Sequence, residues 1–231
     1  MRKLILLALI SLSAIAIAAG SAAADGDDGN DGATKTWRVT ITNLTPLGPD
    51  AHGSQPLSPP LFVVHSKQAD VWSDGEIANH GVAAIAEDAN NKVLETALPA
   101  LPGVKTVFTG AGGGLPSGVT RSYTVETEGE FNRLSIVTML VHTNDAFTGL
   151  DSFKLSAKKS VHEPIAWDSG SEVNDELRAH MPGPCCGHPF VRVPEGALIG
   201  PHEGITGRGD LPAAVYDWNG AAARITIERI S

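Results

Sequence analysis

The run of residues 133–141, RLSIVTMLV, constrains the fold of this chain more than any other stretch. Its apolar side chains fall on both alternating faces of an extended segment, which is typical of a central strand covered on each side. Asn144 and Asp145 follow at once, and Asp151 comes shortly after. Oxygen ligands held in a turn by a rigid strand suit a hard cation such as Ca²⁺, which binds six to eight oxygens. The stretch therefore predicts a buried strand that leads into a candidate cation loop.

The first residues predict a secretory signal peptide, residues 1–24. Arg2 and Lys3 precede an apolar run over residues 4–18, and small residues continue up to Ala24. The apolar run is shorter than the roughly 20 residues of a comfortable membrane span. We therefore expect cleavage near Ala24 and a secreted or periplasmic product, not an integral membrane protein.

The charge of the chain argues against one class of partner. There are 17 Lys and Arg against 26 Asp and Glu, a formal net charge of −9 at pH 7, and loss of Arg2 and Lys3 would make the product more acidic. Such a charge repels phosphate backbones and anionic lipid, so nucleic acid is not an expected partner. A solvated acidic surface explains most of the charge by itself.

Period-two alternation marks several strands. Residues 25–36 are mostly Asp, Gly, Asn and Ala and are expected to form a disordered tether. Folding is expected to begin at Trp37, where apolar and polar residues alternate, and the same alternation predicts strands at residues 122–127 and 224–230. The folded domain is therefore predicted to span residues 37–231.

Prolines and glycines divide the rest of the chain. The prolines of residues 55–65 exclude a helix and predict an extended edge strand. A short helical insertion is expected after Asn79, a good helix cap, because apolar residues then recur at helical spacing. The glycine-rich residues 110–118 predict a flexible hairpin connection. Together these features predict an all-β fold, an antiparallel β-sandwich with one helical insertion.

A second acidic loop lies at residues 166–176, AWDSGSEVNDE, and contains Asp168, Glu172 and Asn174. Asp and Asn are also common turn formers that bond to their own backbone. The residues alone therefore favour a turn over a metal site in this loop. The following residues 181–212 are rich in Pro, Gly and His and too long for a simple connection, so they are either functional or poorly ordered.

The two cysteines, Cys185 and Cys186, are adjacent and cannot close an ordinary covalent loop. A vicinal disulfide, intermolecular pairing that makes a dimer, and free thiols all remain open. With His188 nearby, they resemble a fragment of a soft-metal site, but a fourth ligand is not evident at a familiar spacing.

Four segments of the chain resemble the N-terminal spondin domain: WRVTITNLTP, QPLSPP, SIVTMLVHTNDAFTGLDSFKL and WDSGSE. The terminal ARITIERI also fits, so the similarity extends over roughly residues 37–230. On these motifs the chain is identified as a member of the spondin N-terminal domain family, a module of extracellular matrix proteins and of many exported bacterial proteins.

The resemblance implies a fold and a site. The fold is a β-sandwich similar to calcium-dependent lipid-binding domains, with a calcium site formed by loops at one end. The acidic positions of the family fall on Asp145, Asp168 and Glu172, the last being Glu where animal members have Asp. Asn144 and Asn174 are further candidate metal ligands. The cysteines of animal members have no match in the Cys185–Cys186 pair.

We therefore expect an exported, non-catalytic, calcium-binding module that mediates contact with a cell surface, matrix, glycan or protein ligand, as in cell adhesion. A second hypothesis is a metal- or histidine-assisted hydrolase with its site in residues 181–212 and His142 at its floor. Neither a Gly-x-Ser-x-Gly elbow nor a His-Glu-x-x-His motif is present to support it. Arg208, Gly209 and Asp210 spell an Arg-Gly-Asp tripeptide, to which we assign no function because its glycines simply mark a turn.

Overall fold

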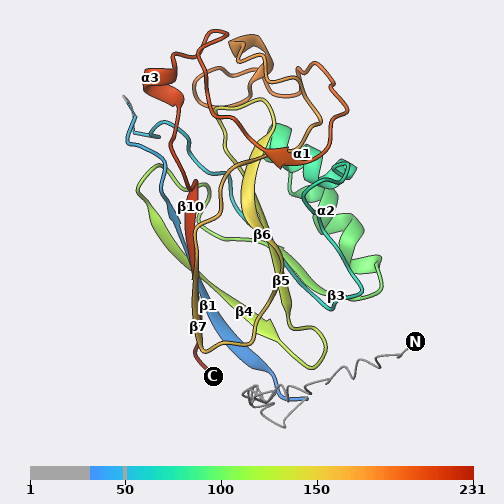
Figure 1. The fold of residues 1–231 in the computed structure, drawn as a ribbon. Coiled ribbons are helices and arrows are strands. Elements are labelled where there is room, and N and C mark those ends of the chain that lie inside the picture. Colours follow the sequence, from blue (N-terminus) through green and yellow to red (C-terminus); the bar gives the residue numbers. More distant parts are fainter. Residues whose placement is uncertain (1–31, 49–50) are drawn as a thin grey trace, which may run out of the picture. The chain divides into compact units, whose positions relative to one another are not determined.

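Two antiparallel sheets build the domain, as seen in a computed structural model that describes residues 32–48 and 51–231. The four-stranded sheet has the order β4-β1-β10-β7, and the six-stranded sheet has the order β3-β2-β5-β6-β8-β9. The sheets form two layers (Figure 1), and the larger of two apolar clusters draws its side chains from both of them. The expected all-β sandwich is confirmed.

The four-stranded sheet follows the alternation in the sequence. Its strands are β1 (Lys35–Asn43), β4 (Thr120–Thr127), β7 (Lys159–His162) and β10 (Ala223–Arg229). Trp37, Val39 and Ile41 of β1 are almost fully buried in the core. On the exposed face between them, the hydroxyls of Thr40 and Ser122 share a 2.8 Å hydrogen bond across the strands. The face of this sheet that packs on the core is therefore apolar, and the opposite face is polar and exposed to solvent.

The six-stranded sheet is covered on both faces. Its strands are β2 (Leu61–His65), β3 (Val104–Thr109), β5 (Arg133–Met139), β6 (Ala146–Lys154), β8 (Trp167–Asp168) and β9 (Gly200–Pro201). In β2, Phe62 and Val64 belong to the core between the sheets, while Leu61 and Val63 belong to a second apolar cluster on the outer face. The neighbouring β5 is apolar on both faces for the same reason, as its sequence predicts.

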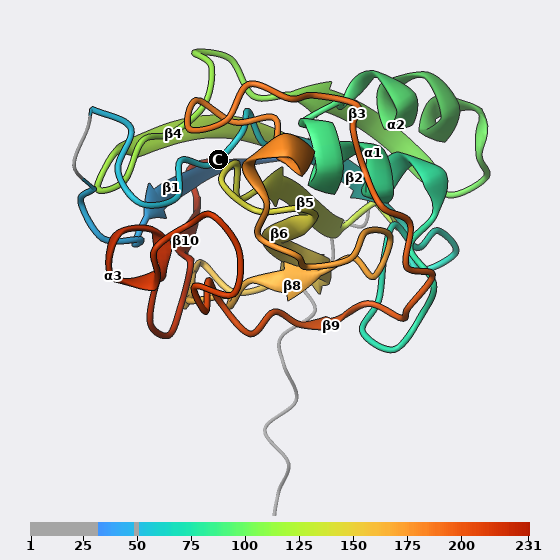
Figure 2. The ribbon, with the colours of Figure 1, turned by 90° about the horizontal axis from the view of Figure 1, so that it is seen from above.

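The expected helical insertion covers that outer face as two helices, α1 (His80–Asp88) and α2 (Lys92–Ala97), followed by the 3-10 turn η1 (Leu98–Ala100). Figure 2 shows both beside β2 and β3, on the side away from β1. The Asn79 side chain accepts hydrogen bonds from the N–H groups of Gly81 and Val82, at 3.0 and 3.1 Å, which confirms the predicted cap. Ala89 adopts a left-handed conformation, with φ of 55°, and ends α1.

The expectation of an edge strand in residues 55–65 is wrong. β2 pairs with β3 on one side and with β5 on the other, so it lies inside the sheet and β3 forms the edge. The prolines all precede the strand at Leu61. They therefore remove no hydrogen bond from the ladder, and the apolar run can pair on both sides.

The expectation of a hairpin at residues 110–118 is also wrong. This segment joins β3 of the six-stranded sheet to β4 of the four-stranded sheet, so it crosses from one layer to the other. Leu115 is fully buried, and its N–H and C=O groups bond to the backbone of Leu57 at 2.8 and 2.9 Å. Because Leu115 is buried and bonded to Leu57, this glycine-rich segment forms an ordered connection between the two sheets.

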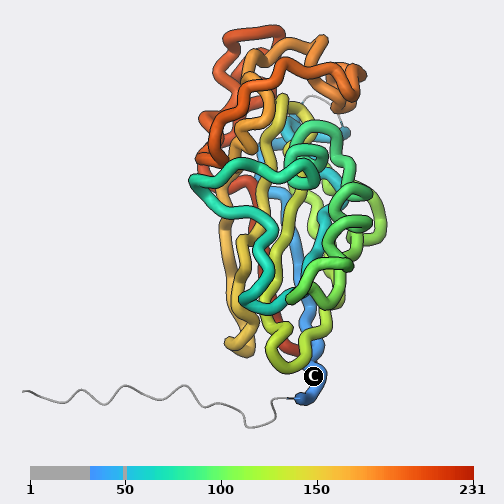
Figure 3. Tube along the Cα trace, turned by 90° about the vertical axis from the view of Figure 1, so that its right-hand side faces the viewer, coloured from blue at the N-terminus to red at the C-terminus, as the bar shows by residue number. Residues whose placement is uncertain are grey.

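The long connection between β7 and β10 contains β8, β9, the 3-10 turn η2 (Arg178–His180) and the short helix α3 (Ala213–Tyr216). Figure 3 shows these orange and red segments gathered mainly at one end of the two sheets. In residues 32–48 and 51–231, no helix has the length and apolar character of a membrane span. The predicted signal peptide lies outside the described residues, and β1 already begins at Lys35, inside the stretch expected to be a tether.

Candidate metal centre

The two acidic loops meet at the end of the six-stranded sheet. β5 and β6 are joined by a turn that includes Asp145, and β6 pairs with β8 so that Ala146 lies opposite Asp168. The N–H of Ser169 then donates to the carbonyl of Asp145 at 3.2 Å. Strand pairing between segments far apart in the chain therefore brings together the two loops that the resemblance assigns to one site.

One carboxylate oxygen of Asp145 organises the second loop. Its Oδ2 accepts hydrogen bonds from the Ser169 hydroxyl at 2.8 Å, from the Ser171 N–H at 2.9 Å and from the Glu172 N–H at 3.0 Å. The other oxygen, Oδ1, is buried and has no hydrogen-bond partner among the described residues. Asp145 thus fixes the loop with one oxygen and leaves the other unsatisfied in the interior.

Glu172 repeats this pattern. Its side chain is almost fully buried, and within the described part of the chain its Oε1 has no hydrogen-bond partner. Burial raises the pKa of Glu172 to about 8, and repulsion from Asp145 adds to the shift, against a hydrogen bond with Asn144 that lowers it. Asp145 and Glu172 therefore each have one buried carboxylate oxygen without a hydrogen-bond partner in the described residues, and the two carboxylates repel each other.

The other two carboxyl groups of the site are also held away from their ordinary acidity. Burial raises the pKa of Asp145 to about 6, with repulsion from Asp168 as the next cause, although its hydrogen bonds oppose the shift. Burial likewise raises the pKa of Asp168, while hydrogen bonds from Gly170 and Asn174 lower it. All three predicted acidic ligands are thus destabilised in their charged forms.

The two asparagines join the same network as positioning residues. Asn144 donates to Asp175 Oδ1 at 3.1 Å, and its own Oδ1 accepts the Glu176 N–H at 3.2 Å. Asn174 donates to Asp168 Oδ2, and its Oδ1 lies 3.1 Å from the Nε2 of His202. The structure therefore places both residues beside the carboxylates, with their amide oxygens already engaged by other groups.

The donor set fits a cation in part. In the described part of the chain, no group of three or more His, Cys, Asp or Glu side chains is preassembled as a metal cluster. Asp145 Oδ2 and Asp168 Oδ1 instead accept hydrogen bonds from the backbone N–H groups of Glu172 and Gly170. Two atoms do suit a cation: Asp145 Oδ1 and Glu172 Oε1 have no hydrogen-bond partner in the described residues, and carboxylate oxygens are hard ligands of the kind that Ca²⁺ prefers.

Glu176 is a buried carboxylate to which the sequence assigned no role. It accepts hydrogen bonds from the N–H groups of Thr206, Gly207 and Arg208 at 2.7 to 2.8 Å, and from the Thr206 hydroxyl. Burial raises its pKa, but these hydrogen bonds outweigh burial and hold the pKa below its usual value. We call this set of donors around the Glu176 carboxylate the Glu176 cradle. No local sequence motif predicts it, because the donors lie some 30 residues further along the chain.

The Arg-Gly-Asp tripeptide lies in this cradle and uses its charged side chains within the domain. Arg208 forms ion pairs with Glu203 and Glu176. Asp210 Oδ2 accepts the N–H of Arg178 at 3.1 Å. Since both charged side chains already have partners, the structure offers no support for a receptor-binding role.

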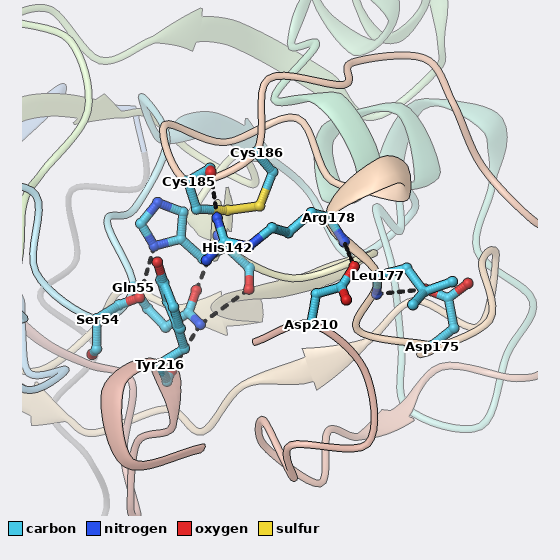
Figure 4. Close-up of a disulfide and its surroundings, with 10 residues drawn as sticks. All are labelled: Ser54, Gln55, His142, Asp175, Leu177, Arg178, Cys185, Cys186, Asp210 and Tyr216. Atoms are coloured by element: carbon cyan, nitrogen blue, oxygen red, sulfur yellow. Dashed lines mark hydrogen bonds between the residues drawn. A yellow bond between two sulfur atoms is a disulfide. The ribbon is translucent and has the colours of Figure 1, made fainter. Parts of the chain in front are cut away.

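His142, the expected floor of a hydrolase site, is fully buried, and Figure 4 shows it beside Ser54, Gln55 and Tyr216. Its Nδ1 is 2.8 Å from the carbonyl oxygen of Ser54, and its ring packs edge-on against Tyr216, with 5.3 Å between ring centroids. These contacts make His142 part of the packing beneath the loop end.

Two further histidines that the hydrolase hypothesis would use also have identifiable partners. His180 Nδ1 lies 2.6 Å from Asp175 Oδ2, and His202 Nε2 lies 3.1 Å from Asn174 Oδ1. Burial lowers the pKa of His202 to about 4, which keeps this ring neutral at physiological pH. The partners are a carboxylate and an amide, neither of which is a nucleophile that histidine would activate.

A serine–histidine pair that no sequence motif predicts occurs elsewhere in the domain. His65 Nε2 and the Ser135 hydroxyl are 2.9 Å apart, and both residues are fully buried inside the six-stranded sheet. The same hydroxyl oxygen accepts the N–H of Ser152, where the pairing of β5 and β6 shifts by a residue. The pair therefore completes a β-bulge and is closed to substrate.

Cys185 and Cys186 are joined to each other by a disulfide bond. Of the alternatives that the sequence left open, the structure shows the vicinal one. The intermolecular pairing and the soft-metal fragment with His188 both require a free thiolate, and the described residues contain no free cysteine.

Comparison with known proteins places this site in a family. No curated protein matches the chain. The family model described as Spondin_N matches residues 49–172, which is more than half of the chain. The matched segment includes β2, the helices α1 and α2, and the strands β3 to β8, and it ends at Glu172. Asp145, Asp168 and Glu172 therefore all fall within the match. The chain belongs to the Spondin_N family, the spondin N-terminal domain family.

Proposed function

We propose that this spondin-type domain is an exported, non-catalytic module that binds a calcium ion between its two acidic loops and acts by contact. The observation that carries the proposal is the pair of buried carboxylate oxygens without partners, Asp145 Oδ1 and Glu172 Oε1. A buried carboxylate is tolerated only when a proton, a hydrogen-bond donor or a cation compensates its charge.

Protons compensate only part of the buried charge at neutral pH. With a pKa of about 6, Asp145 is mostly charged at pH 7, whereas Glu172, at about 8, is mostly protonated. A dication supplies enough charge for both groups, and Asp168 is the third carboxylate beside them. Asp145, Glu172 and Asp168 would hold the ion, whose chemistry here is structural: it neutralises charge and holds two loops together.

The contact surface is assigned to residues 190–198, which we call the covering segment. Its backbone bonds to the second acidic loop: Val193 accepts the N–H of Val173 at 2.8 Å, and Ala197 donates to Gly170 at 2.7 Å. The segment also exposes apolar side chains to solvent: Phe190, Val191, Val193 and Leu198. An ion that orders the acidic loop would therefore also order an apolar surface suited to a protein, glycan or cell-surface partner.

Calcium titration of the purified protein, after removal of metal with a chelator, tests the ion. We expect calorimetry to show one bound ion per chain, and the melting temperature to rise on addition of Ca²⁺. Asp145→Asn should abolish both effects. Glu126→Gln, which removes the same charge from an exposed position on β4, should abolish neither.

Two results would contradict the ion site. The first is a wild-type protein that shows no binding heat and the same melting temperature in calcium and in chelator. The second is an equal loss of binding in both variants, which would mean that net charge rather than a defined site attracts the ion.

Binding to a glycan array and to isolated cell envelopes, with calcium or with chelator, tests the contact role. Phe190→Ser and Asp145→Asn should each reduce binding, because one alters the exposed apolar surface and the other its support. If both variants bind as well as the wild type, and if chelator does not change binding, the covering segment is excluded as the contact surface.

A further inference from the structure

The disulfide lies in a short loop, residues 181–188, which we call the disulfide loop. The loop is closed by backbone hydrogen bonds from His188 to Met181 and from Cys186 to Gly183, both of 3.0 Å. Met181 is fully buried, and both cysteines pack against the edge of the main core while remaining partly exposed. The loop is therefore anchored at its base and reachable by solvent at the disulfide.

One side of the disulfide loop rests on the chain that leads into the ion site. Gly183 is so close to this chain that a Cβ there would lie 2.4 Å from the Val141 carbonyl oxygen and 2.7 Å from the His142 ring. Only a residue without a side chain permits this approach. His142 is two residues before Asn144 and three before Asp145, so the loop bears directly on the start of the first acidic loop.

The other side of the disulfide loop is tied to the second acidic loop through Arg178. The guanidinium of Arg178 donates to the carbonyl oxygen of Cys185 at 2.7 Å (Figure 4). Just before Arg178, Glu176 donates its N–H to Asn144 Oδ1, and Asp175 accepts the Asn144 amide. Asn144 in turn hydrogen-bonds Glu172. The disulfide loop thus contacts both segments that position the carboxylates.

We propose that the Cys185–Cys186 disulfide is a redox control on the calcium site, a proposal that rests on the calcium-binding function proposed above. An external dithiol is the reductant. Its thiolate attacks one sulfur and forms a mixed disulfide, and its second thiol then displaces the protein sulfur. Two electrons and two protons pass to the protein, which gains two Cys thiols, while the dithiol leaves as its own disulfide.

The disulfide bond acts locally because it joins adjacent residues. Chain-entropy stabilisation grows with the length of the closed loop, so a bond between neighbours adds little to global stability. What the bond restricts is the peptide between Cys185 and Cys186, which places the Cys185 carbonyl in front of Arg178. Reduction frees this peptide, loosens the Arg178 contact and lets the segment that holds Asn144 move. Calcium affinity falls as a result.

Calcium titration of the purified protein in its oxidised form and after treatment with dithiothreitol tests the proposal. We expect reduction to weaken calcium binding at least tenfold, with little change in the melting temperature measured in chelator. The double variant Cys185→Ser, Cys186→Ser should match the reduced wild type. Arg178→Gln should weaken binding in the oxidised form and remove the response to reduction. Arg224→Gln, at an arginine paired with Glu163 on the surface, should leave the response intact.

The outcomes separate the two proposals. Equal calcium affinity in the oxidised and reduced proteins overturns the redox control and leaves the calcium site standing. Absence of calcium binding in both forms overturns the calcium site and the redox control together. Loss of the folded state on reduction in chelator, seen as a lost melting transition, also overturns the redox control, because the disulfide would then support the whole fold. Faster amide hydrogen exchange at residues 176–178 on reduction, without calcium present, supports it independently.

Discussion

Two groups of buried carboxylates in the same loop cluster have opposite electrostatics. Glu176 receives three backbone N–H groups and a hydroxyl, and its pKa lies below the usual value. Asp145 and Glu172 are equally buried, yet each keeps one oxygen without a partner in the described residues, and their pKa values rise to about 6 and about 8. Burial is the largest cause of the raised pKa values, and it is offset at Glu176, where donors reach both carboxylate oxygens, but not at Asp145, where they reach only Oδ2. The chain satisfies Glu176 by itself, whereas Asp145 and Glu172 form the site for which we propose a calcium ion.

Replacement of Glu176 should have the largest effect on stability. In Glu176→Ala, the N–H groups of Thr206, Gly207 and Arg208 lose their acceptor, and buried donors without partners are costly. We expect a loss of about 3 kcal/mol in the free energy of unfolding, measured by urea denaturation. The loss should be the same in calcium and in chelator. A loss of less than about 1 kcal/mol would show that water replaces the carboxylate in this cradle.

The pH dependence of stability should separate the two groups next. Folding raises the pKa of Glu172 from 4.5 to about 8, so the folded state holds this proton more tightly than the unfolded state does. Its contribution to stability is full below the unfolded pKa and is lost as the pH rises through the folded pKa. In chelator, the melting temperature should therefore fall between pH 5 and pH 8.

Calcium should remove this fall, because the ion competes with the proton and binds best to the charged carboxylates. Glu172→Gln in chelator should stabilise the protein by about 1 kcal/mol at pH 8 and flatten the pH profile, because the amide stays neutral. The measurement is a set of thermal melts from pH 5 to pH 8 with and without calcium. A wild-type melting temperature in chelator that rises over this range would contradict the raised pKa.

Replacement of Arg208 should have the smallest effect. Its side chain is 45% exposed and pairs with Glu203 and Glu176, and exposed ion pairs contribute little. Arg208→Ala should lower the free energy of unfolding by about 0.5 kcal/mol in urea denaturation. Comparing the stability losses of Arg208→Ala and Glu176→Ala shows whether the backbone N–H donors or the arginine charge stabilise the buried Glu176 carboxylate. A loss as large as that of Glu176→Ala would assign the stability to the ion pair.

Much of the fold could be predicted from local patterns. The alternation from Trp37 and the cap at Asn79 were confirmed because they depend on neighbouring residues and on a simple contrast between apolar and polar side chains. The edge assignment of residues 55–65 failed because pairing on both sides of β2 is decided by β3 and β5, which are distant in the chain. The crossover at Leu115 was missed for the same reason, since its partner Leu57 lies in another segment.

The candidate site was predicted in its residue types but not in its connections. Asp145, Asp168 and Glu172 stand out because acidic residues cluster beside turn formers, and the resemblance to the spondin family paired the two loops. Ser169 and Ser171, which bond to Asp145, gave no signal of their own. Hydroxyls and backbone N–H groups leave no distinctive mark in a sequence, because almost every residue type supplies them.

By itself, the sequence determined which segments form strands, where the first helix begins and where the acidic side chains lie, because these follow from local periodicity and composition. Only the tertiary structure decided that the acidic loops meet, that Glu176 is satisfied while Asp145 and Glu172 are not, and that Cys185 bonds to Cys186 over the approach to the site. Each of these outcomes depends on which donors and acceptors the folded chain brings within hydrogen-bonding or bonding distance. For the acidic loops and for Glu176, that distance is set by the packing of segments remote in sequence, whereas for the adjacent cysteines it is set by the conformation of the disulfide loop.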